Sequence, residues 1–308
     1  GCYNICPMSC ISMQYDEEGF KFPVVDETRC INCKQCERVC PIINGRYETN
    51  NNNEGYAAIN CNEEIRLNSS SGGIFYQFAK KIIDLGGVVV GAVMSNDCKE
   101  ANHIFVDNKN DLSSLLGSKY LQSNIGKTFQ KIKISINNNK LVLFSGTPCQ
   151  VGALNNYLGK EYDNLICIDL ICHGVPSPGL WKKNIEYIEK ELHTKIENVN
   201  FRCKKDNCAF GKTNDYQNLY FIPKEEDMYY RLFLSDYSLR LSCYDCKFKG
   251  ISRNSDITLG DFWGINDFLP EMEDGKGVSL VIIHSEKGKR IFEKIRSHLK
   301  IEKIDTEK

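Results

Sequence analysis

The chain has 308 residues and a formal net charge of −1, with 39 basic and 40 acidic side chains. This balance excludes the basic footprint of a nucleic-acid-binding protein, and no apolar run is long enough to span a membrane. Sixteen cysteines without a recognisable signal peptide indicate metal ligands in a reducing compartment rather than the disulfides of small secreted domains, so we expect a cytoplasmic protein.

The chain opens with a dense set of cysteines. Cys30, Cys33, Cys36 and Cys40 follow the spacing C-x2-C-x2-C-x3-C, and Pro41 comes next. This spacing is typical of bacterial ferredoxins that carry two clusters. Zinc is the alternative, but zinc sites usually consist of two separated pairs, often with histidine, and the first hundred residues contain no histidine. The spacing therefore predicts iron–sulfur clusters.

A second run lies upstream, where Cys2 and Cys6, followed by Pro7, repeat the end of the first pattern. In two-cluster ferredoxins the fourth cysteine of each run binds the other run's cluster. Cys2 and Cys40 then belong to a cluster whose other two cysteines would precede Gly1. We accordingly take Gly1 as a truncated start and expect this cluster to be partial or absent. A complete 4Fe-4S cluster is predicted on Cys6, Cys30, Cys33 and Cys36.

The predicted elements continue in chain order. A hairpin is expected over residues 19–25, and a polar linker over residues 48–54 follows a ferredoxin-like module of residues 1–45. Beyond the linker, hydrophobic patterns alternate between strands and helices. Strands are predicted at 56–60, 88–93, 103–106, 141–144, 165–171, 199–202, 219–222 and 278–284. Helices are predicted at 73–85, 128–136, 149–158, 178–193, 229–239 and 288–299.

Alternating strands and helices predict the α/β class, with a mixed or parallel sheet flanked by helices on both faces. The N-terminal part is expected to be an α+β ferredoxin-like module. We expect residues 55–308 to form one α/β domain, with a candidate division near residue 195.

Three segments have residue types suited to a bound cofactor. The serine and glycine run at 69–73 opens a helix, where free N–H groups favour phosphate, although an ordinary cap and turn has the same pattern. The turn at 145–148 also precedes a helix. Lys119, next to Tyr120, could pair with a phosphate or be a solvated surface charge. Asp261 lies in a run of glycines and aromatics that suits a flavin or substrate pocket, or a strand followed by an aromatic loop.

Four further cysteines lie near turns. A close pair and two single cysteines could bind another 4Fe-4S cluster, with zinc as the metal alternative. Cys203 and Cys208 are competing candidates in a charged loop, and we take them as free thiols. The four candidate ligands are Cys149, Cys172, Cys243 and Cys246.

Five motifs occur in one order: SSGG at 70–73, GSKY at 117–120, FSGTPCQ at 144–150, CHGVP at 172–176 and LGDFWG at 259–264. With the ferredoxin module, they closely resemble the coenzyme F420 hydrogenase and dehydrogenase beta subunit family over nearly the whole chain. The resemblance implies FAD in the α/β domain, beside an iron–sulfur cluster on the four further cysteines. The expected cofactor-binding residues are Ser70, Ser71, Gly72, Gly73, Lys119, Tyr120, Ser145, Gly146, Thr147 and Asp261.

These expectations favour an enzyme, an FAD-dependent oxidoreductase that exchanges electrons with ferredoxin or a dehydrogenase subunit and acts on a small two-electron substrate. One alternative is a relay subunit that passes electrons to a partner holding the catalytic metal, and another is a structural zinc protein. His173 is the candidate proton donor, since the pKa of histidine is ordinarily near neutral, with a structural histidine as the alternative.

Overall fold

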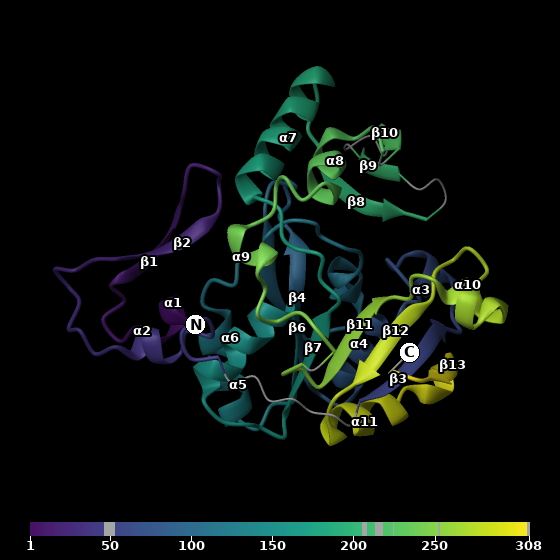
Figure 1. Cartoon of the computed structure of the whole chain (residues 1–308), viewed down its shortest axis with the longest axis horizontal. Helices are drawn as coiled ribbons and strands as arrows, with labels where there is room; N and C mark the ends of the chain where they lie inside the picture. The colour runs from purple at the N-terminus through teal and green to yellow at the C-terminus, as the bar shows by residue number, and fades with distance from the viewer. Residues whose placement is uncertain (46–52, 205–207, 213–217, 224, 252, 307–308) are drawn as a thin grey trace.

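An eight-stranded sheet forms the centre of the molecule (Figure 1). The computed structural model describes residues 1–45, 53–204, 208–212, 218–223, 225–251 and 253–306. The strand order is β13-β3-β12-β11-β7-β6-β4-β5. Strands β11, β7, β6 and β4 are parallel, and the pairs on either side are antiparallel. The predicted α/β class with a mixed sheet is confirmed. The strands are β3 (Glu54–Asn60), β4 (Val88–Met94), β5 (Ala101–Val106), β6 (Val142–Gly146), β7 (Leu165–Leu170), β11 (Ile257–Asp261), β12 (Ser279–Ile283) and β13 (Leu299–Ile304).

Helices cover both faces of this sheet. Val89 and Val90 are adjacent in β4 and fully buried, yet they belong to different hydrophobic clusters because successive side chains of a strand point to opposite faces. Val89 packs with Phe78 of α4 and Phe292 of α11, whereas Val90 packs with Phe129 of α5 and the residues of α6. The covering helices are α4 (Ile74–Asp84), α5 (Thr128–Asn137), α6 (Pro148–Leu158) and α11 (Glu286–Glu293).

A smaller unit follows the carboxyl end of β7. Its core contains Trp181 and Phe201, and Tyr120 from the larger domain packs edge-on against Phe201. This unit lies at one end of the central strands (Figure 1). Its elements are α7 (Pro178–Glu191), the three-stranded sheet β8 (Asn198–Cys203), β9 (Cys208–Lys212) and β10 (Asn218–Pro223), and α8 (Met228–Leu234).

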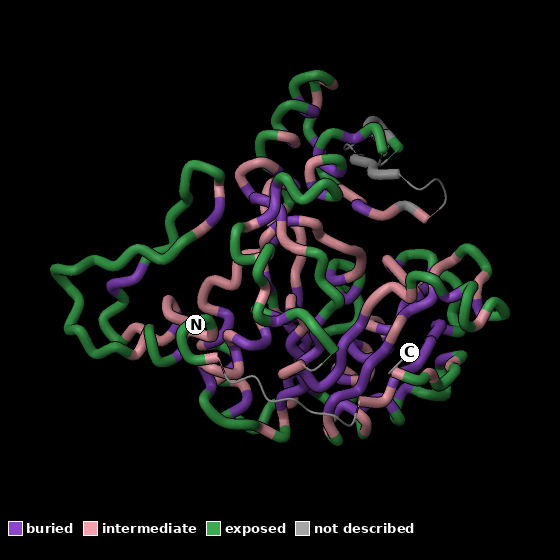
Figure 2. Tube along the Cα trace, in the orientation of Figure 1, coloured by how far each residue is buried: buried purple, intermediate pink, exposed green. Residues whose placement is uncertain are grey.

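The ferredoxin module projects from the edge of the α/β domain, and most of its chain is exposed (Figure 2). Its hairpin is longer than predicted, because β1 already begins at Ile11. Most of the predicted linker over residues 48–54 lies outside the described residues. The elements of the module are α1 (Cys2–Ile5), β1 (Ile11–Tyr15), β2 (Lys21–Val25) and α2 (Gln35–Arg38).

The last helix is shorter than predicted, and a strand takes its place. We expected a helix to residue 299, but α11 ends at Glu293 and β13 pairs with β3 as the edge of the sheet. Apolar and charged residues of β13 alternate from Leu299 to Glu302, and Lys303 then breaks the pattern. Short elements without a periodic pattern were also not predicted: α3 (Glu63–Leu67), η1 (Asn110–Leu115), α9 (Leu241–Tyr244), α10 (Ile265–Phe268) and η2 (Pro270–Met272). The short helix η3 (Arg296–His298) lies inside the range predicted as helix.

Gly72 provides a test of how the turn before α4 is packed. A Cβ at Gly72 would lie 2.4 Å from the Ala58 carbonyl oxygen and 2.8 Å from the Ser279 N. We therefore expect Gly72→Ala to lower the free energy of unfolding by about 1–3 kcal/mol, as overpacking usually does. At Gly91 a Cβ would meet only the Leu115 side chain, at 3.3 Å, so Gly91→Ala is the matched control. Urea unfolding measures both, and equal losses would contradict this packing.

Candidate metal and cofactor sites

In the ferredoxin module, Cys10 lies beside two of the predicted ligands. The Sγ atoms of Cys6 and Cys10 are 3.3 Å apart, and Cys10 also interacts with Cys30. The hydrogen bond with Cys6 raises the pKa of the Cys10 thiol to about 11, with desolvation as the next cause. Cys36 has a raised pKa, first through desolvation, and the charge of Cys2 contributes. Cys10, which the cysteine spacing did not include as a ligand, therefore lies between two of the predicted ligands.

Four thiols from three parts of the chain meet in the α/β domain. Cys149 lies in the first turn of α6, directly after β6, and Cys172 lies two residues after β7. Cys243 is in α9, and Cys246 follows that helix. Because the carboxyl ends of parallel strands meet at one edge of a sheet, β6 and β7 bring their cysteines together. We call these four residues the cysteine quartet.

The four thiols of the quartet are close enough that the charges of every pair would interact once the thiols ionise. Cys149 and Cys172 are exposed to solvent, and Cys243 and Cys246 are half-buried. Desolvation, followed by the charges of the other three thiols, raises the pKa of Cys172 to about 12. Desolvation is also the main cause of the raised pKa of Cys149 and of Cys243. Four such thiols cannot all ionise without a compensating positive charge.

The quartet is not arranged as the ligands of a single metal ion. Within the described part of the chain, no three His, Cys, Asp or Glu side chains have the geometry to hold one ion. The thiols described, fourteen in all, are free. The side chains of the competing candidates Cys203 and Cys208 lie outside what the structure describes. The choice of ligands therefore remains a prediction.

The serine–glycine turn, residues 69–73, is joined to two other segments. The Ser70 hydroxyl oxygen accepts hydrogen bonds from the N–H and the hydroxyl of Ser118, at 2.7 and 2.8 Å. Ser71 donates to the Val278 carbonyl, and Ser279 accepts from the Gly72 N–H. Gly73, at φ +81°, precedes α4 without a side-chain cap. The turn at 145–147 is closed differently, because the Gln150 side chain accepts from the Thr147 N–H at 2.9 Å.

Lys119 is held by backbone oxygens. Its Nζ donates to the carbonyls of Leu116, at 2.7 Å, and Ser114, at 3.2 Å. Desolvation lowers the pKa of Lys119 to about 7. Its charge also acts on His103, a buried residue that the sequence did not single out. His103 Nε2 is 3.1 Å from the Ser145 carbonyl oxygen, and its Nδ1 is buried without a hydrogen-bond partner.

Arg202 joins two of the predicted cofactor residues, Tyr120 and Asp261. Its guanidinium forms an ion pair with Asp261 and also interacts with the Tyr120 hydroxyl. Lys204, two residues further along, donates to the carbonyls of Arg66, Ser71 and Lys276. Desolvation lowers the pKa of Lys204 to about 8, and the neighbouring arginines add to this. Arg202 and Lys204 stand two positions apart at the end of β8, a spacing that puts them on one face of the strand. The sequence prediction did not use this signal.

His173 lies beside the quartet on the surface. Its Nε2 is 2.7 Å from Asp236 Oδ1, and its ring packs edge-on against Phe233. The side chain is 48% exposed. The carboxylate thus orients a histidine that solvent can reach.

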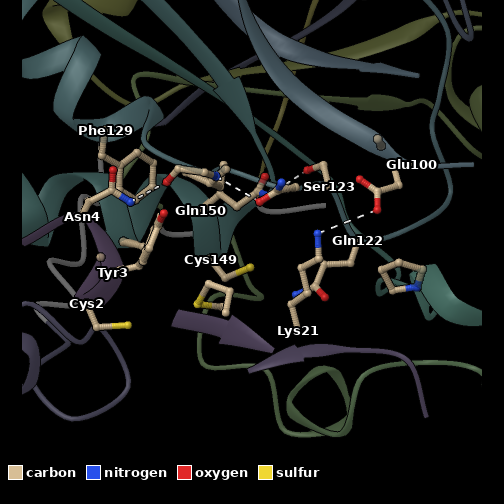
Figure 3. A pocket seen from close by; sticks show the side chains of 18 of the residues that line it. Cys2, Tyr3, Asn4, Lys21, Glu100, Gln122, Ser123, Phe129, Cys149 and Gln150 are labelled. Atoms are coloured by element: carbon tan, nitrogen blue, oxygen red, sulfur yellow. Dashed lines mark hydrogen bonds and ion pairs between the residues drawn. The ribbon is translucent and has the colours of Figure 1, made fainter. Parts of the chain in front are cut away.

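A cavity of about 200 Å³ lies between the ferredoxin module and the α/β domain (Figure 3). Cys2 of the module and Cys149 of the quartet both line it. Lys21 and Glu100 form an ion pair at its wall, with their charged atoms 4.0 Å apart. The cavity therefore lies between a predicted ligand of the ferredoxin module, Cys2, and a predicted ligand of the α/β domain, Cys149.

The comparisons with known proteins agree with this arrangement. A profile that describes the C terminus of the coenzyme F420 hydrogenase/dehydrogenase beta subunit matches residues 139–308, more than half of the chain. The chain belongs to the coenzyme F420 hydrogenase/dehydrogenase beta subunit family. A second profile, described as a 4Fe-4S dicluster domain, matches residues 1–43.

A solved structure, that of the xenon-derivatised F420-reducing NiFe hydrogenase complex from Methanosarcina barkeri, contains a chain of similar fold. The TM-score is 0.55 at 15% sequence identity, and the similarity covers 83% of this chain and 82% of the other. No curated protein matches the chain. The family member described here is thus an iron–sulfur, electron-transfer subunit of the oxidoreductase class. Its described helices include none that is both long and apolar enough to cross a membrane.

Lys204 gives a test of how the serine–glycine turn is held. We expect Lys204→Met to make amide hydrogen exchange in residues 66–72 at least about tenfold faster, because hydrogen bonds from a charged group contribute about 1.5–3 kcal/mol each. Hydrogen-exchange mass spectrometry measures this, with Lys183→Met, an exposed lysine of α7, as the control. Unchanged exchange in the turn would show that Lys204 does not stabilise it.

Proposed function

We propose that this chain is an iron–sulfur flavoprotein oxidoreductase. It would pass single electrons between 4Fe-4S clusters and an FAD that reduces or oxidises a small two-electron substrate. The observation that carries the proposal is that the quartet gathers at the carboxyl ends of β6 and β7. Its Cys149 follows the turn at 145–147 and lines the cavity beside the ferredoxin module. A cluster on the quartet would thus receive electrons from the ferredoxin module and pass them to an FAD bound nearby.

The quartet suits a 4Fe-4S cluster better than zinc. A tetrahedral zinc site needs every sulfur about 2.3 Å from one ion. The described side chains have no such group, although the charges of the four thiols would interact once they ionise. A cluster of four irons is larger than one ion and presents one iron to each thiolate. Its iron would also supply the positive charge that the four thiols require.

The FAD phosphates are proposed to bind between the serine–glycine turn and Lys119. The start of α4 has no side-chain cap, so its N–H groups can donate hydrogen bonds to an anion. Ser70 is bonded to Ser118, the neighbour of Lys119, which places this lysine close to the turn. An ammonium group has three N–H donors, and carbonyls occupy two of those of Lys119. The third donor could bind a phosphate oxygen.

Bound FAD would supply the exchange between single electrons and electron pairs. The residues of this chain would bind and orient it. Tyr120 and Asp261, joined through Arg202, lie where the smaller unit meets the central sheet, and we propose that they contact the flavin or the substrate. His173 is the proposed proton donor, because Asp236 orients its ring and solvent can renew its proton.

For the substrate, we propose a small-molecule two-electron carrier. Coenzyme F420 is the first compound to test, because the structural relative belongs to an F420-reducing hydrogenase complex. The redox partner would be a ferredoxin or a dehydrogenase subunit. The relay alternative has one observation in its favour: Trp263, next to the Asp261 site, is 80% exposed and could be covered by a partner subunit. Substrate turnover by the isolated chain with reduced ferredoxin would favour the enzyme.

The cluster assignment is tested by iron, sulfide and flavin analysis after anaerobic purification. Cys172→Ala should remove about four irons per chain, since the quartet would lose one ligand of a four-iron cluster. Cys33→Ala should remove a different cluster, that of the ferredoxin module. Cys98→Ala changes a buried thiol outside both sites and should retain all iron. Full iron content in Cys172→Ala would refute the quartet cluster.

The flavin placement predicts a pH dependence. The pKa of Lys119 is lowered to about 7 without a ligand, and a bound phosphate would raise it. The complex then binds more protons than the free protein, so the FAD affinity should fall as the pH rises above about 7. Fluorescence titration of the flavin-depleted protein with FAD, between pH 6.5 and 9, measures this slope. Lys119→Met should bind FAD more weakly and with a flatter slope. An identical slope in both proteins would contradict the assignment.

A further inference from the structure

Arg240 occupies the place where the ferredoxin module meets the residues next to the quartet. It immediately precedes α9, which carries Cys243 (Figure 1). The Arg240 N–H donates to the Val175 carbonyl at 3.0 Å, and the Cys243 N–H donates to the Arg240 carbonyl at 2.7 Å. Its backbone is therefore joined to the segment that follows Cys172 and to one ligand of the quartet.

The side chain of Arg240 points the other way, to the hairpin of the module. Nη1 donates to the Lys21 carbonyl at 3.2 Å and to the Gln122 side-chain oxygen at 3.4 Å. The guanidinium lies 3.8 Å from the centre of the Phe22 ring and 5.5 Å from that of Phe20. A planar guanidinium suits such stacking and such hydrogen bonds together. Both Lys21 and Gln122 line the cavity between the two parts.

The positive charge of Arg240 also acts on the quartet. Desolvation lowers the pKa of the guanidinium, and the charges of Cys243, Asp16 and Cys149 oppose that effect. Arginine remains protonated in proteins, so the charge is permanent. Two of the quartet thiols are thus within electrostatic reach of one fixed cation. Reduction of a cluster there would add a negative charge, which a nearby cation stabilises, so the cation raises the reduction potential.

We propose that Arg240 is the positioning residue between the two electron-transfer parts: its charge raises the reduction potential of the cluster on the quartet, and its stacked side chain holds the hairpin of the ferredoxin module against the α/β domain. This inference rests on the proposed function, because it requires a cluster on Cys149, Cys172, Cys243 and Cys246. One electron enters that cluster and no bond forms or breaks. The Arg240 side chain would then couple the position of the module's hairpin to the reduction potential of the quartet cluster.

The experiment compares Arg240→Gln and Arg240→Lys with the unchanged chain, purified anaerobically with its clusters. Redox titration followed by electron paramagnetic resonance gives the midpoint potential of the quartet cluster, whose signal is identified by its loss in Cys172→Ala. Arg240→Gln should lower the equilibrium constant for reduction by about tenfold, which is 59 mV for one electron. Arg290→Gln removes an exposed charge on α11 and should leave the potential unchanged.

Arg240→Lys separates the two roles. Lysine keeps the charge but loses the planar stacking, so the potential should stay near that of the unchanged chain while hydrogen exchange in residues 11–25 becomes faster. Arg240→Gln should alter both. A quartet signal whose potential is the same in Arg240→Gln would overturn the inference and leave the proposed function intact. No quartet signal in the unchanged chain would refute the proposed function itself, and the inference with it.

Discussion

The repulsion that four neighbouring thiolates would exert on one another is the constraint on which the site depends. Parallel pairing of β6 and β7 forces Cys149 and Cys172 to the same edge of the sheet, and the segment after α8 brings the other two cysteines beside them. The raised pKa values of Cys149, Cys172 and Cys243 indicate that these three sulfurs are difficult to ionise as they stand. A metal cluster reverses this cost, because it replaces thiol protons with iron. The fold therefore creates an unfavourable arrangement of thiols that a cluster would stabilise.

The ferredoxin module depends on the larger domain and on its iron for stability. So short a segment has little core: most of its residues are exposed, and those buried include Cys10, Phe20 and Val39 (Figure 2). Contacts with the larger domain compensate in part. The Asn4 side chain donates to the Gly126 carbonyl at 2.8 Å, and the hairpin rests against the start of α7 and against Arg240. Iron would supply the remaining stabilisation, which ties the order of this module to its electron-transfer role.

Local patterns in the sequence were enough for much of the fold. Buried strands such as β4 and amphipathic helices such as α4 have strong periodicity, and the turn at 145–148 marks the start of α6. The edge strand β13 was missed because its apolar pattern is weak and its stability comes from pairing with β3. The contacts of Arg202 and Arg240 join segments far apart in the chain, and no local pattern encodes them. Motif order indicated the quartet, but only the fold shows that its thiols meet.

The pKa shifts at the two candidate sites have opposite signs: those of the thiols are raised and those of the lysines are lowered. At the quartet, desolvation raises the pKa of Cys149, Cys172 and Cys243, and the charge of Arg240 only partly offsets this at Cys243. Beside the serine–glycine turn, Lys119 and Lys204 have pKa values lowered first by desolvation, and both donate to carbonyls rather than to carboxylates. Buried charges without partners are costly, and proteins retain them chiefly where a ligand compensates them. An iron–sulfur cluster at the first site and a phosphate-bearing cofactor at the second would remove both costs. Because β3, which leads to the serine–glycine turn, runs in the same direction as β6 and β7, both sites lie at the same edge of the sheet. That shared edge would keep the two cofactors on one side of the domain, as electron transfer between them requires.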